Sequence, residues 1–311
     1  MPEQEEPDGA FPTEAFPNPE EPGALYLAIR LADRIGADLI LANDPDADRL
    51  AVALPGPDGW KTLSGNQIGV LLGDFVLENT DSPRPLVINS IVSSPLLASI
   101  AESYGARFTQ TLTGFKWIAN AAMDLERDED VEFVFGYEEA LGYTVGPVVR
   151  DKDGMSAALW FADLMAFLRA QPKTLEDRLA SLYRRHGLWV STQKSIVRPG
   201  TEGAAEIDAA MELLREGRPE QLGGFEVAGT TDYRDGAEAR PRWLAAQPLV
   251  EFDLGDAGRA LVRPSGTEPK LKIYVDLKAA LDAGADVPAA EEAAQRDAAA
   301  VADDLAAFLG L

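Results

Sequence analysis

The sequence contains no cysteine, which excludes disulfide bonds, thiolate metal sites and cysteine nucleophiles. Basic residues are scarce: 28 Lys and Arg stand against 52 Asp and Glu, which gives a net charge of −24. Such a surface repels nucleic acids and anionic membranes, so we expect neither as a partner. No apolar run is long enough to span a bilayer and no signal peptide opens the chain. We therefore expect a soluble, cytoplasmic protein.

Two familiar catalytic signatures are also missing. The only histidine, His186, lies in an arginine-rich stretch, and no convincing Ser-His-Asp triad can be assembled around it. Neither the Gly-x-Gly-x-x-Gly fingerprint nor the phosphate-binding Gly-x-x-x-x-Gly-Lys-Ser/Thr loop occurs. Triad, dinucleotide and P-loop chemistry are therefore poor explanations of this chain.

At 311 residues with 46% apolar content, the chain can form two or three domains. Proline and acidic residues dominate 1–22, which predicts an extended arm. Residues 23–62 predict part of an α/β unit: a helix, a strand, an acidic loop and a strand. Strands and helices alternate over 63–178, which predicts a doubly wound, mostly parallel mixed sheet. Strands with few helices between them fill 179–311, which predicts an α+β domain.

Within the predicted sheet domain, three local features are expected. Gly65 and Asn66 offer a cap for the helix that follows. The loops at 113–114 and 136–143 lie at the carboxyl ends of predicted strands, where doubly wound sheets bind their ligands. We therefore expect binding residues in these two loops.

The most informative stretch places Asp44, Asp46 and Asp48 at alternate positions between two apolar runs. Carboxylates crowded in a tight loop repel one another unless a cation lies among them, and hard cations such as Mg²⁺ prefer carboxylate oxygen. Arg49 follows directly and could hold an anion beside the metal. The loop is therefore predicted to be a Mg²⁺ site with an open side.

Two other interpretations of the acidic loop are weaker. A calcium EF-hand loop wants Gly at its sixth position and Glu at its twelfth, where this chain has Arg49 and Pro55. A solvated acidic turn would suit a single Asp-x-Asp, since Asp and Pro are common in turns. Three aspartates between apolar strands make that interpretation less suitable.

A second motif, residues 263–270, is predicted to join two strands near the C-terminus. Ser, Gly and Thr in one turn can point backbone N–H groups and hydroxyls at an anion, and Arg263 offers a planar fork for phosphate. A polar hairpin turn would use the same residue types. From the residues alone, the phosphate site and the simple turn are equally good explanations.

A third motif is the acidic pair Glu138 and Glu139 in a glycine-bounded turn. Ionised carboxylates accept hydrogen bonds from sugar hydroxyls. A glycosidase pair must flank one bond, whereas adjacent residues point in different directions. An acidic surface turn is the alternative. Cations at 149–154 precede a predicted helix, and such cations are more often solvated than functional.

Together and in this order, the motifs resemble those of the α-D-phosphohexomutases, the phosphoglucomutase and phosphomannomutase family. The arm at 16–20 and the Tyr-Glu-Glu-Ala form look closest to the branch of bacterial phosphoglucomutases and phosphopentomutases. The resemblance rests on five stretches: Asp44-Pro45-Asp46-Ala47-Asp48-Arg49, Thr113-Gly114-Phe115-Lys116, residues 136–143, Arg150-Asp151-Lys152-Asp153-Gly154 and residues 263–270.

The resemblance implies a role for each matching residue. Arg49 would lie near the transferred phosphoryl group, and Lys152 would assist as an acid or base. Where most relatives have Ser after the acidic pair, this chain has Ala140, so the choice of sugar stays open. The implied ligands are Asp44, Asp46 and Asp48 for Mg²⁺; Thr113, Gly114 and Glu138 for the sugar; and Arg263, Ser265, Gly266 and Thr267 for the phosphate that is not transferred.

Members of the family have four domains, and the first holds a serine that is phosphorylated in a Thr-x-Ser-His-Asn-Pro-like loop. No serine of this chain precedes a histidine. The chain thus resembles the end of domain 2 followed by domains 3 and 4. We predict a phosphosugar mutase of carbohydrate metabolism, interconverting hexose 1- and 6-phosphates through a phosphoserine and a bisphosphate. Alone it should be inactive, with a missing N-terminal half as partner. The alternatives are a non-catalytic Mg²⁺ and phosphosugar-binding protein and a haloacid-dehalogenase-like phosphatase.

Overall fold

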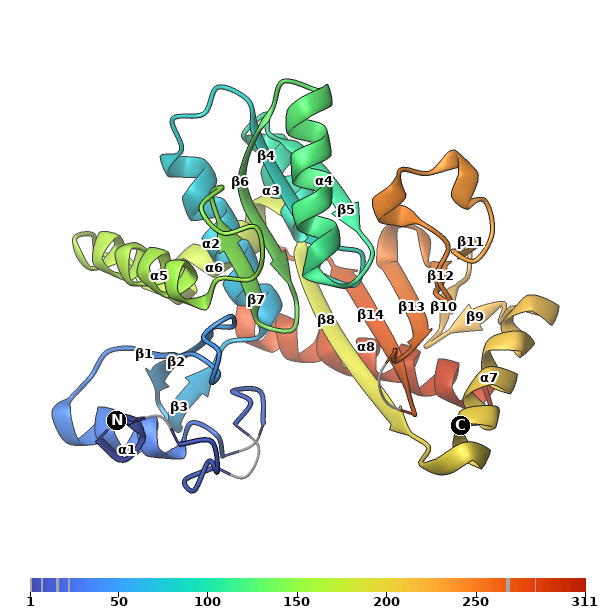
Figure 1. The fold of residues 1–311 in the computed structure, drawn as a ribbon, viewed down its shortest axis with the longest axis horizontal. Coiled ribbons are helices and arrows are strands. Elements are labelled where there is room, and N and C mark those ends of the chain that lie inside the picture. The colour runs from blue at the N-terminus through green and yellow to red at the C-terminus, as the bar shows by residue number, and fades with distance from the viewer. Residues whose placement is uncertain (1, 7, 15–16, 22, 267–268, 283) are drawn as a thin grey trace. The chain divides into compact units, whose positions relative to one another are not determined.

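The computed structural model describes residues 2–6, 8–14, 17–21, 23–266, 269–282 and 284–311 (Figure 1). The chain forms two compact units. The first unit comprises Met1–Ser93 and Leu97–Leu179, and the second comprises Ser94–Leu96 and Ala180–Leu311.

The first unit begins with a small antiparallel sheet. Its strand order is β1-β2-β3, and helix α1 packs on it through Leu25 and Ala32, which meet Ile40 and Ala53. We call β1, β2 and the loop 43–50 between them the acidic hairpin. Among the described residues, the other edge of β1 pairs with no strand. The elements of this part are η1 (Pro2–Gln4), α1 (Tyr26–Ile35), β1 (Ile40–Ala42), β2 (Ala51–Gly56) and β3 (Gly59–Thr62).

The rest of the first unit is a mixed sheet of order β5-β4-β6-β7, which confirms the predicted doubly wound α/β class. Strand β4 pairs in parallel with β5 and β6, and β7 is antiparallel to β6. Helices α2 and α4 cover opposite faces, because Gly73 of α2 lies against Phe135 whereas Gly136 lies against Ile118 of α4. The elements are α2 (Gly65–Asn79), β4 (Pro85–Ser90), α3 (Leu96–Ser103), β5 (Arg107–Thr111), α4 (Phe115–Asp128), β6 (Glu132–Glu138), β7 (Gly142–Val145) and α5 (Gly154–Arg169). Helix α6 (Leu175–His186) begins in the first unit and ends in the second.

Two local predictions in this part were wrong. Helix α2 is capped by Ser64, not by Gly65 and Asn66, because Ser64 and Gln67 form a reciprocal capping box. The predicted loop 136–143 is largely strand: only 139–141 form the turn between β6 and β7. Tyr137 and Tyr143 face each other across this hairpin with their rings stacked. Aromatic cross-strand pairs stabilise strands, so the flanking glycines do not end them here.

The second unit is built on an antiparallel five-stranded sheet of order β11-β12-β13-β14-β8. Helix α8 covers one face of it (Figure 1), the face on which Lys194 of β8 pairs with Asp303 of α8. This is the predicted α+β arrangement. The elements are β8 (Leu188–Val197), α7 (Gly200–Glu216), β9 (Gln221–Leu222), β10 (Phe225–Glu226), β11 (Gly229–Asp232), η2 (Ala237–Ala239), η3 (Arg242–Leu244), β12 (Val250–Asp253), η4 (Gly255–Ala257), β13 (Gly258–Pro264), β14 (Lys270–Ala279) and α8 (Val287–Phe308).

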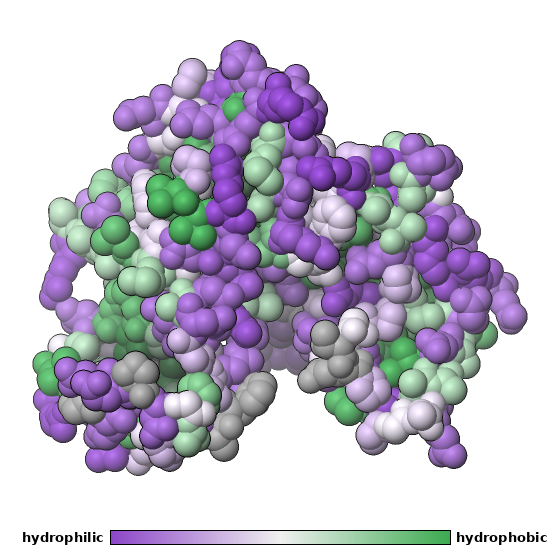
Figure 2. Space-filling model, in the orientation of Figure 1, coloured by the Kyte–Doolittle hydropathy of each residue, from purple (hydrophilic) through white to green (hydrophobic). Residues whose placement is uncertain are grey.

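The visible surface is mainly hydrophilic, with apolar residues in small separate patches (Figure 2). No described helix has the combined length and apolar character that a membrane span requires. In the first unit a cavity of ≈ 580 Å³ lies between the acidic hairpin and the helices α5 and α6. Leu39, Leu54 and Met165 are among its apolar lining residues, and the ion pair of Asp38 with Arg169, 2.8 Å long, lies at its wall.

Candidate active site

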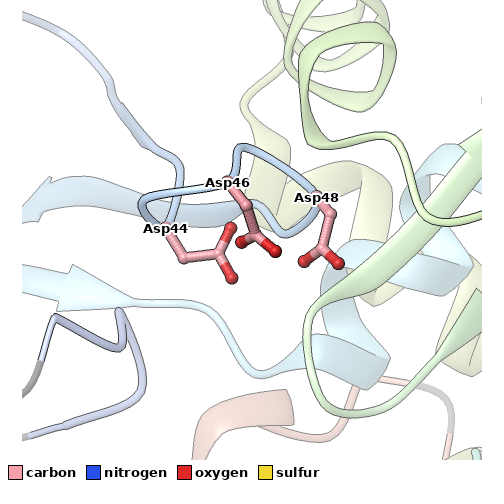
Figure 3. A group of neighbouring side chains, drawn as sticks. All are labelled: Asp44, Asp46 and Asp48. Atoms are coloured by element: carbon pink, nitrogen blue, oxygen red, sulfur yellow. The ribbon is translucent and has the colours of Figure 1, made fainter.

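The acidic loop brings its three aspartates together. Because β1 and β2 are antiparallel, the chain reverses between them, and Ala47 adopts a left-handed φ of 56° at the bend. The N–H of Ala47 donates to the carbonyl oxygen of Asp44 at 3.0 Å, which tightens the turn. Oxygen atoms of Asp44, Asp46 and Asp48 lie within 4.8 Å of one another, and their carboxylates point to the same side (Figure 3).

The electrostatics of this cluster suit a divalent cation. Burial raises the pKa of Asp44, and the charge of Asp48 raises it further, against an opposing hydrogen bond from the N–H of Arg49. Within the described part of the chain, the buried Oδ1 of Asp48 has no hydrogen-bond partner, and Nε of Arg49 is 3.8 Å away. Three hard oxygen donors with one oxygen unsatisfied fit Mg²⁺ better than they fit an isolated turn.

Arg49 lies beside the aspartates, where the sequence predicted it. Its Nε is 3.1 Å from Oδ2 of Asp44, and its Nη1 donates to Oδ1 of Asn18 at 3.3 Å. Glu20 lies 3.9 Å from the same Nη1. The N-terminal segment therefore contacts the site, which the prediction of an extended arm did not anticipate. The signal available in the sequence was the match of residues 16–20 to a family motif.

Lys152 also reaches the acidic loop. Its Nζ lies 2.8 Å from Oδ2 of Asp48. Burial lowers the pKa of Lys152, but the hydrogen bond and charge of Asp48, with smaller contributions from Asp151 and Glu138, leave that pKa above its usual value. The shift favours the charged ammonium form of the side chain. The segment before α5 places it there, since the N–H of Asp153 donates to the carbonyl oxygen of Tyr143 at 2.7 Å.

The predicted sugar-site residues Gly114 and Glu138 are in contact. The N–H of Gly114 donates to Oε1 of Glu138 at 2.6 Å. Thr113 precedes Gly114 in the loop between β5 and α4. Since β5 and β6 both run parallel to β4, these residues meet at the carboxyl edge of the sheet, as predicted.

Backbone contacts join the acidic loop to the β6–β7 hairpin. The N–H of Leu50 donates to the carbonyl oxygen of Leu141 at 3.0 Å, and Arg49 forms a β-bridge with Gly142. The N–H of Gly154 donates to the carbonyl oxygen of Ala47 at 3.1 Å. A Cβ at Gly154 would overlap the carbonyl oxygen of Arg49. The acidic loop, the β6–β7 turn and the start of α5 therefore form one packed junction.

The predicted phosphate loop lies in the second unit, between β13 and β14. The N–H of Ser265 donates to the carbonyl oxygen of Lys270 at 2.7 Å and closes the hairpin, so this amide is not a candidate anion donor. Gly266 is exposed, and among the described residues other than its chain neighbours no atom lies within 4 Å of where a Cβ would be. Thr267 lies outside the described residues.

Sequence reasoning missed two polar neighbours of Arg263. Lys272 lies directly opposite Arg263 on β14, and Ser195 of β8 lies directly opposite Lys272. Opposed residues of antiparallel strands share a face of the sheet. The alternation Lys270-Leu271-Lys272 was the available signal, because it places both lysines on one side of a predicted strand.

Three family models match the chain in order. They describe phosphoglucomutase/phosphomannomutase α/β/α domain II over residues 1–56, α/β/α domain III over residues 64–186 and the C-terminal domain over residues 226–306. The chain belongs to the α-D-phosphohexomutase family.

Named relatives of this chain include mutases for different sugars. A probable phosphomannomutase from Haemophilus influenzae is 43% identical over 274 residues, which cover 88% of this chain and 53% of the relative. The phosphopentomutase of Mus musculus is 38% identical over 299 residues, which cover 89% of this chain and 48% of the phosphopentomutase. The chain thus spans about half the length of the curated relatives it matches.

Two solved structures share the fold. Parafusin, a phosphoglucomutase from Paramecium, superposes with a TM-score of 0.62 at 19% identity, over 89% of this chain and 47% of the parafusin chain. A putative phosphomannomutase from Thermus thermophilus superposes with a TM-score of 0.60 at 18% identity, over 94% of this chain and 50% of that protein's chain. At these identities the likeness supports the architecture alone.

Proposed function

We propose that this chain is the metal- and sugar-binding portion of a phosphosugar mutase that interconverts hexose 1- and 6-phosphates in carbohydrate metabolism. The observation that supports this most is the junction in the first unit. There the aspartate cluster, Lys152 and the Glu138–Gly114 pair come from four separate stretches of sequence and lie together. A solvated acidic turn would not need a lysine and two further loops packed around it.

The proposal assigns roles to this chain's own residues. Asp44, Asp46 and Asp48 would hold Mg²⁺, which when bound neutralises charge on a phosphoryl group. Arg49 would bind the anion next to the metal, and Lys152 would act as an acid in its ammonium form or as a base in its neutral form on the reacting oxygen atoms. The sugar hydroxyls would bind Glu138, Thr113 and Gly114. The phosphate that is not transferred would bind Arg263, Ser265, Gly266 and Thr267.

The reaction needs a phosphoryl donor in addition to these groups. A phosphoserine passes its phosphoryl group to the free hydroxyl of a sugar monophosphate, giving a bisphosphate. The serine then takes back the phosphoryl group from the other position, which releases the isomeric monophosphate. No serine here precedes a histidine, as the family's phosphoserine does. We therefore propose that a polypeptide with the amino-terminal portion of a family member supplies it.

A complementation assay tests this function. Turnover of glucose 1-phosphate would be measured with the chain alone, with an amino-terminal half from a relative, and with both together. We expect turnover only from the pair, and only with Mg²⁺ present. Robust turnover by the chain alone would contradict the proposal that a second polypeptide supplies the phosphoserine. Release of inorganic phosphate by the chain alone would instead favour a phosphatase.

A further inference from the structure

Glu139, the second acid of the pair, faces a different set of groups from Glu138. Its Oε2 accepts hydrogen bonds from Oγ of Ser90 at 3.1 Å and from Oγ of Ser93 at 3.3 Å. The two hydroxyl oxygens are 2.8 Å apart, and both serines are fully buried at the end of β4. The N–H of Glu139 donates to Oγ of Ser93 at 3.0 Å. One serine therefore holds both the backbone and the carboxylate of Glu139.

The turn that contains Glu139 is strained and crowded. Leu141 has a left-handed φ of 62°, which a residue with a Cβ rarely adopts and which three-residue hairpin loops usually give to glycine. At Gly65, the first residue of α2, a Cβ would overlap the carbonyl oxygen of Glu139. The hydroxyl of Tyr143 donates to the carbonyl oxygen of Gly65 at 3.2 Å. A turn with this conformation needs anchors from outside itself.

The turn has functional residues on both sides. Glu138 precedes it and accepts the N–H of Gly114 at 2.6 Å. Leu141 ends it and accepts the N–H of Leu50, next to the acidic loop, at 3.0 Å. A displacement of the turn would therefore move the proposed sugar acid first. The aspartates would move less, because Asn43 donates to the carbonyl oxygen of Arg49 at 2.6 Å within their own loop.

We propose that Glu139 is a positioning residue: its carboxylate, held by Ser90 and Ser93, fixes the turn 139–141 and so sets the position of Glu138. Hydrogen bonds from hydroxyls to a carboxylate are about twice as strong as those between neutral groups. A glutamine can place its one oxygen where Oε2 lies, so it keeps the volume and an acceptor but loses the negative charge. The role of Glu138 in sugar binding rests on the proposed function, whereas the positioning itself does not.

Amide hydrogen exchange on the full chain tests the positioning without any ligand. In Glu139→Gln we expect the amides of Gly114 and Leu50 to exchange about tenfold faster, with those of the central strand β4 unchanged. Ser93→Ala should speed the same amides at least as much, because it also removes the acceptor of the Glu139 N–H, and the double variant should show less than the sum of the two effects, because the changes share one hydrogen bond. Glu129→Gln is the matched control: its carboxylate pairs with Arg107 on the surface of the same unit.

Calorimetry then shows what the turn positions. Glucose 1-phosphate, titrated with Mg²⁺ in excess, should bind Glu139→Gln about tenfold more weakly than it binds the unchanged chain. Mn²⁺ alone should bind Glu139→Gln and the unchanged chain with affinities that differ by no more than about twofold. A general loss of stability would weaken the binding of both the sugar phosphate and the metal. Equal exchange at Gly114 in Glu139→Gln and in the unchanged chain would overturn the inference. If the unchanged chain does not bind glucose 1-phosphate, the proposed function fails, and the exchange rates still decide the role of Glu139.

Discussion

The acidic hairpin and the β6–β7 hairpin are built from the same parts in the same order: a helix, a strand, an acidic turn and an antiparallel strand. They differ in support. Strand β6 also pairs with β4, and helices cover both faces of its sheet. Strand β1 pairs only with β2 among the described residues, and α1 leaves Ile35 65% exposed and Tyr26 59% exposed. Each hairpin has one edge strand, β7 or β1, and one inner strand, β6 or β2, but only the sheet that contains β6 is shown to have helices on both faces.

This difference shows where the precision of the acidic loop comes from. The loop 43–50 is longer than the turn 139–141, and its own sheet is small. Its fixed points include contacts with the better supported part of the unit: Leu50 with Leu141, Ala47 with Gly154 and Asp48 with Lys152. We therefore expect the β6–β7 hairpin and the start of α5 to order the acidic hairpin, and changes at these contacts should separate the two.

The largest expected effect is on metal binding. Asp46→Asn removes one anionic ligand from the acidic loop, and we expect the affinity for Mn²⁺ to fall by more than about 100-fold, since loss of outer-sphere partners already costs about 10–100-fold. Manganese titration followed by electron paramagnetic resonance measures it. Asp38→Asn removes the same charge outside the loop, and Glu138→Gln removes it from the other turn. If either control loses as much Mn²⁺ affinity as Asp46→Asn, the loss comes from the change in net charge and not from a missing ligand.

The next effect is on the packing between the hairpins. Gly154→Val places a side chain against the carbonyl oxygen of Arg49, a backbone atom that cannot rotate away. We expect the free energy of unfolding in urea to fall by about 2 kcal/mol. Gly142→Ala should lower the free energy of unfolding by less, because its Cβ would meet the flexible side chain of Lys152. Met155→Val, at an exposed neighbour, should stay within about 0.5 kcal/mol. If Met155→Val lowers the free energy of unfolding as much as Gly154→Val does, the loss comes from the low helix propensity of valine and not from the contact with the carbonyl oxygen of Arg49.

A smaller and opposite effect is expected at Lys152. Its ammonium group competes with a metal ion for Asp48, so Lys152→Gln should strengthen Mn²⁺ binding by up to about fivefold, the range of a partly exposed ion pair. Lys61→Gln removes the same charge from the exposed strand β3 and controls for long-range attraction. Weaker Mn²⁺ binding in Lys152→Gln would show that the lysine orders the loop more than it competes.

The smallest effect concerns the acidic hairpin alone. The indole N–H of Trp60 donates to Oδ1 of Asp33 at 2.7 Å and ties β3 to α1. Trp60→Phe should cost about 0.5–1.5 kcal/mol, the net contribution of one hydrogen bond. Hydrogen exchange should quicken in β1 and β2 and not in β4. Equal acceleration in all three strands would show that the two hairpins unfold together.

Local patterns were enough for much of this molecule. The alternating aspartates encode their turn within a few residues, and the alternation of strands and helices over 63–178 encodes the class of the sheet. The aspartate cluster could be predicted because its members are neighbours in sequence, and a turn between two strands leaves them little choice of position. Family resemblance supplied the order of the motifs.

What could not be predicted depends on partners far apart in sequence. Ser93 and Glu139 are separated by 46 residues, and nothing near either one indicates their contact. Strand β6 extends to Glu138 because Tyr143 pairs with Tyr137 across the hairpin, which the glycines on either side conceal. Strands β9 and β10 were missed because runs of two residues show no periodicity.

The outer edge of β1 has a further consequence for how the chain behaves in solution. Its residues Ile40–Ala42 have no neighbouring strand on that side within the described part of the chain, and such edges can accept a strand from another molecule. The net charge of −24 opposes that encounter. Added electrolyte screens the repulsion, with a Debye length near 10 Å at about 0.1 M. Ionic strength is therefore the condition that should bring two copies together at this edge.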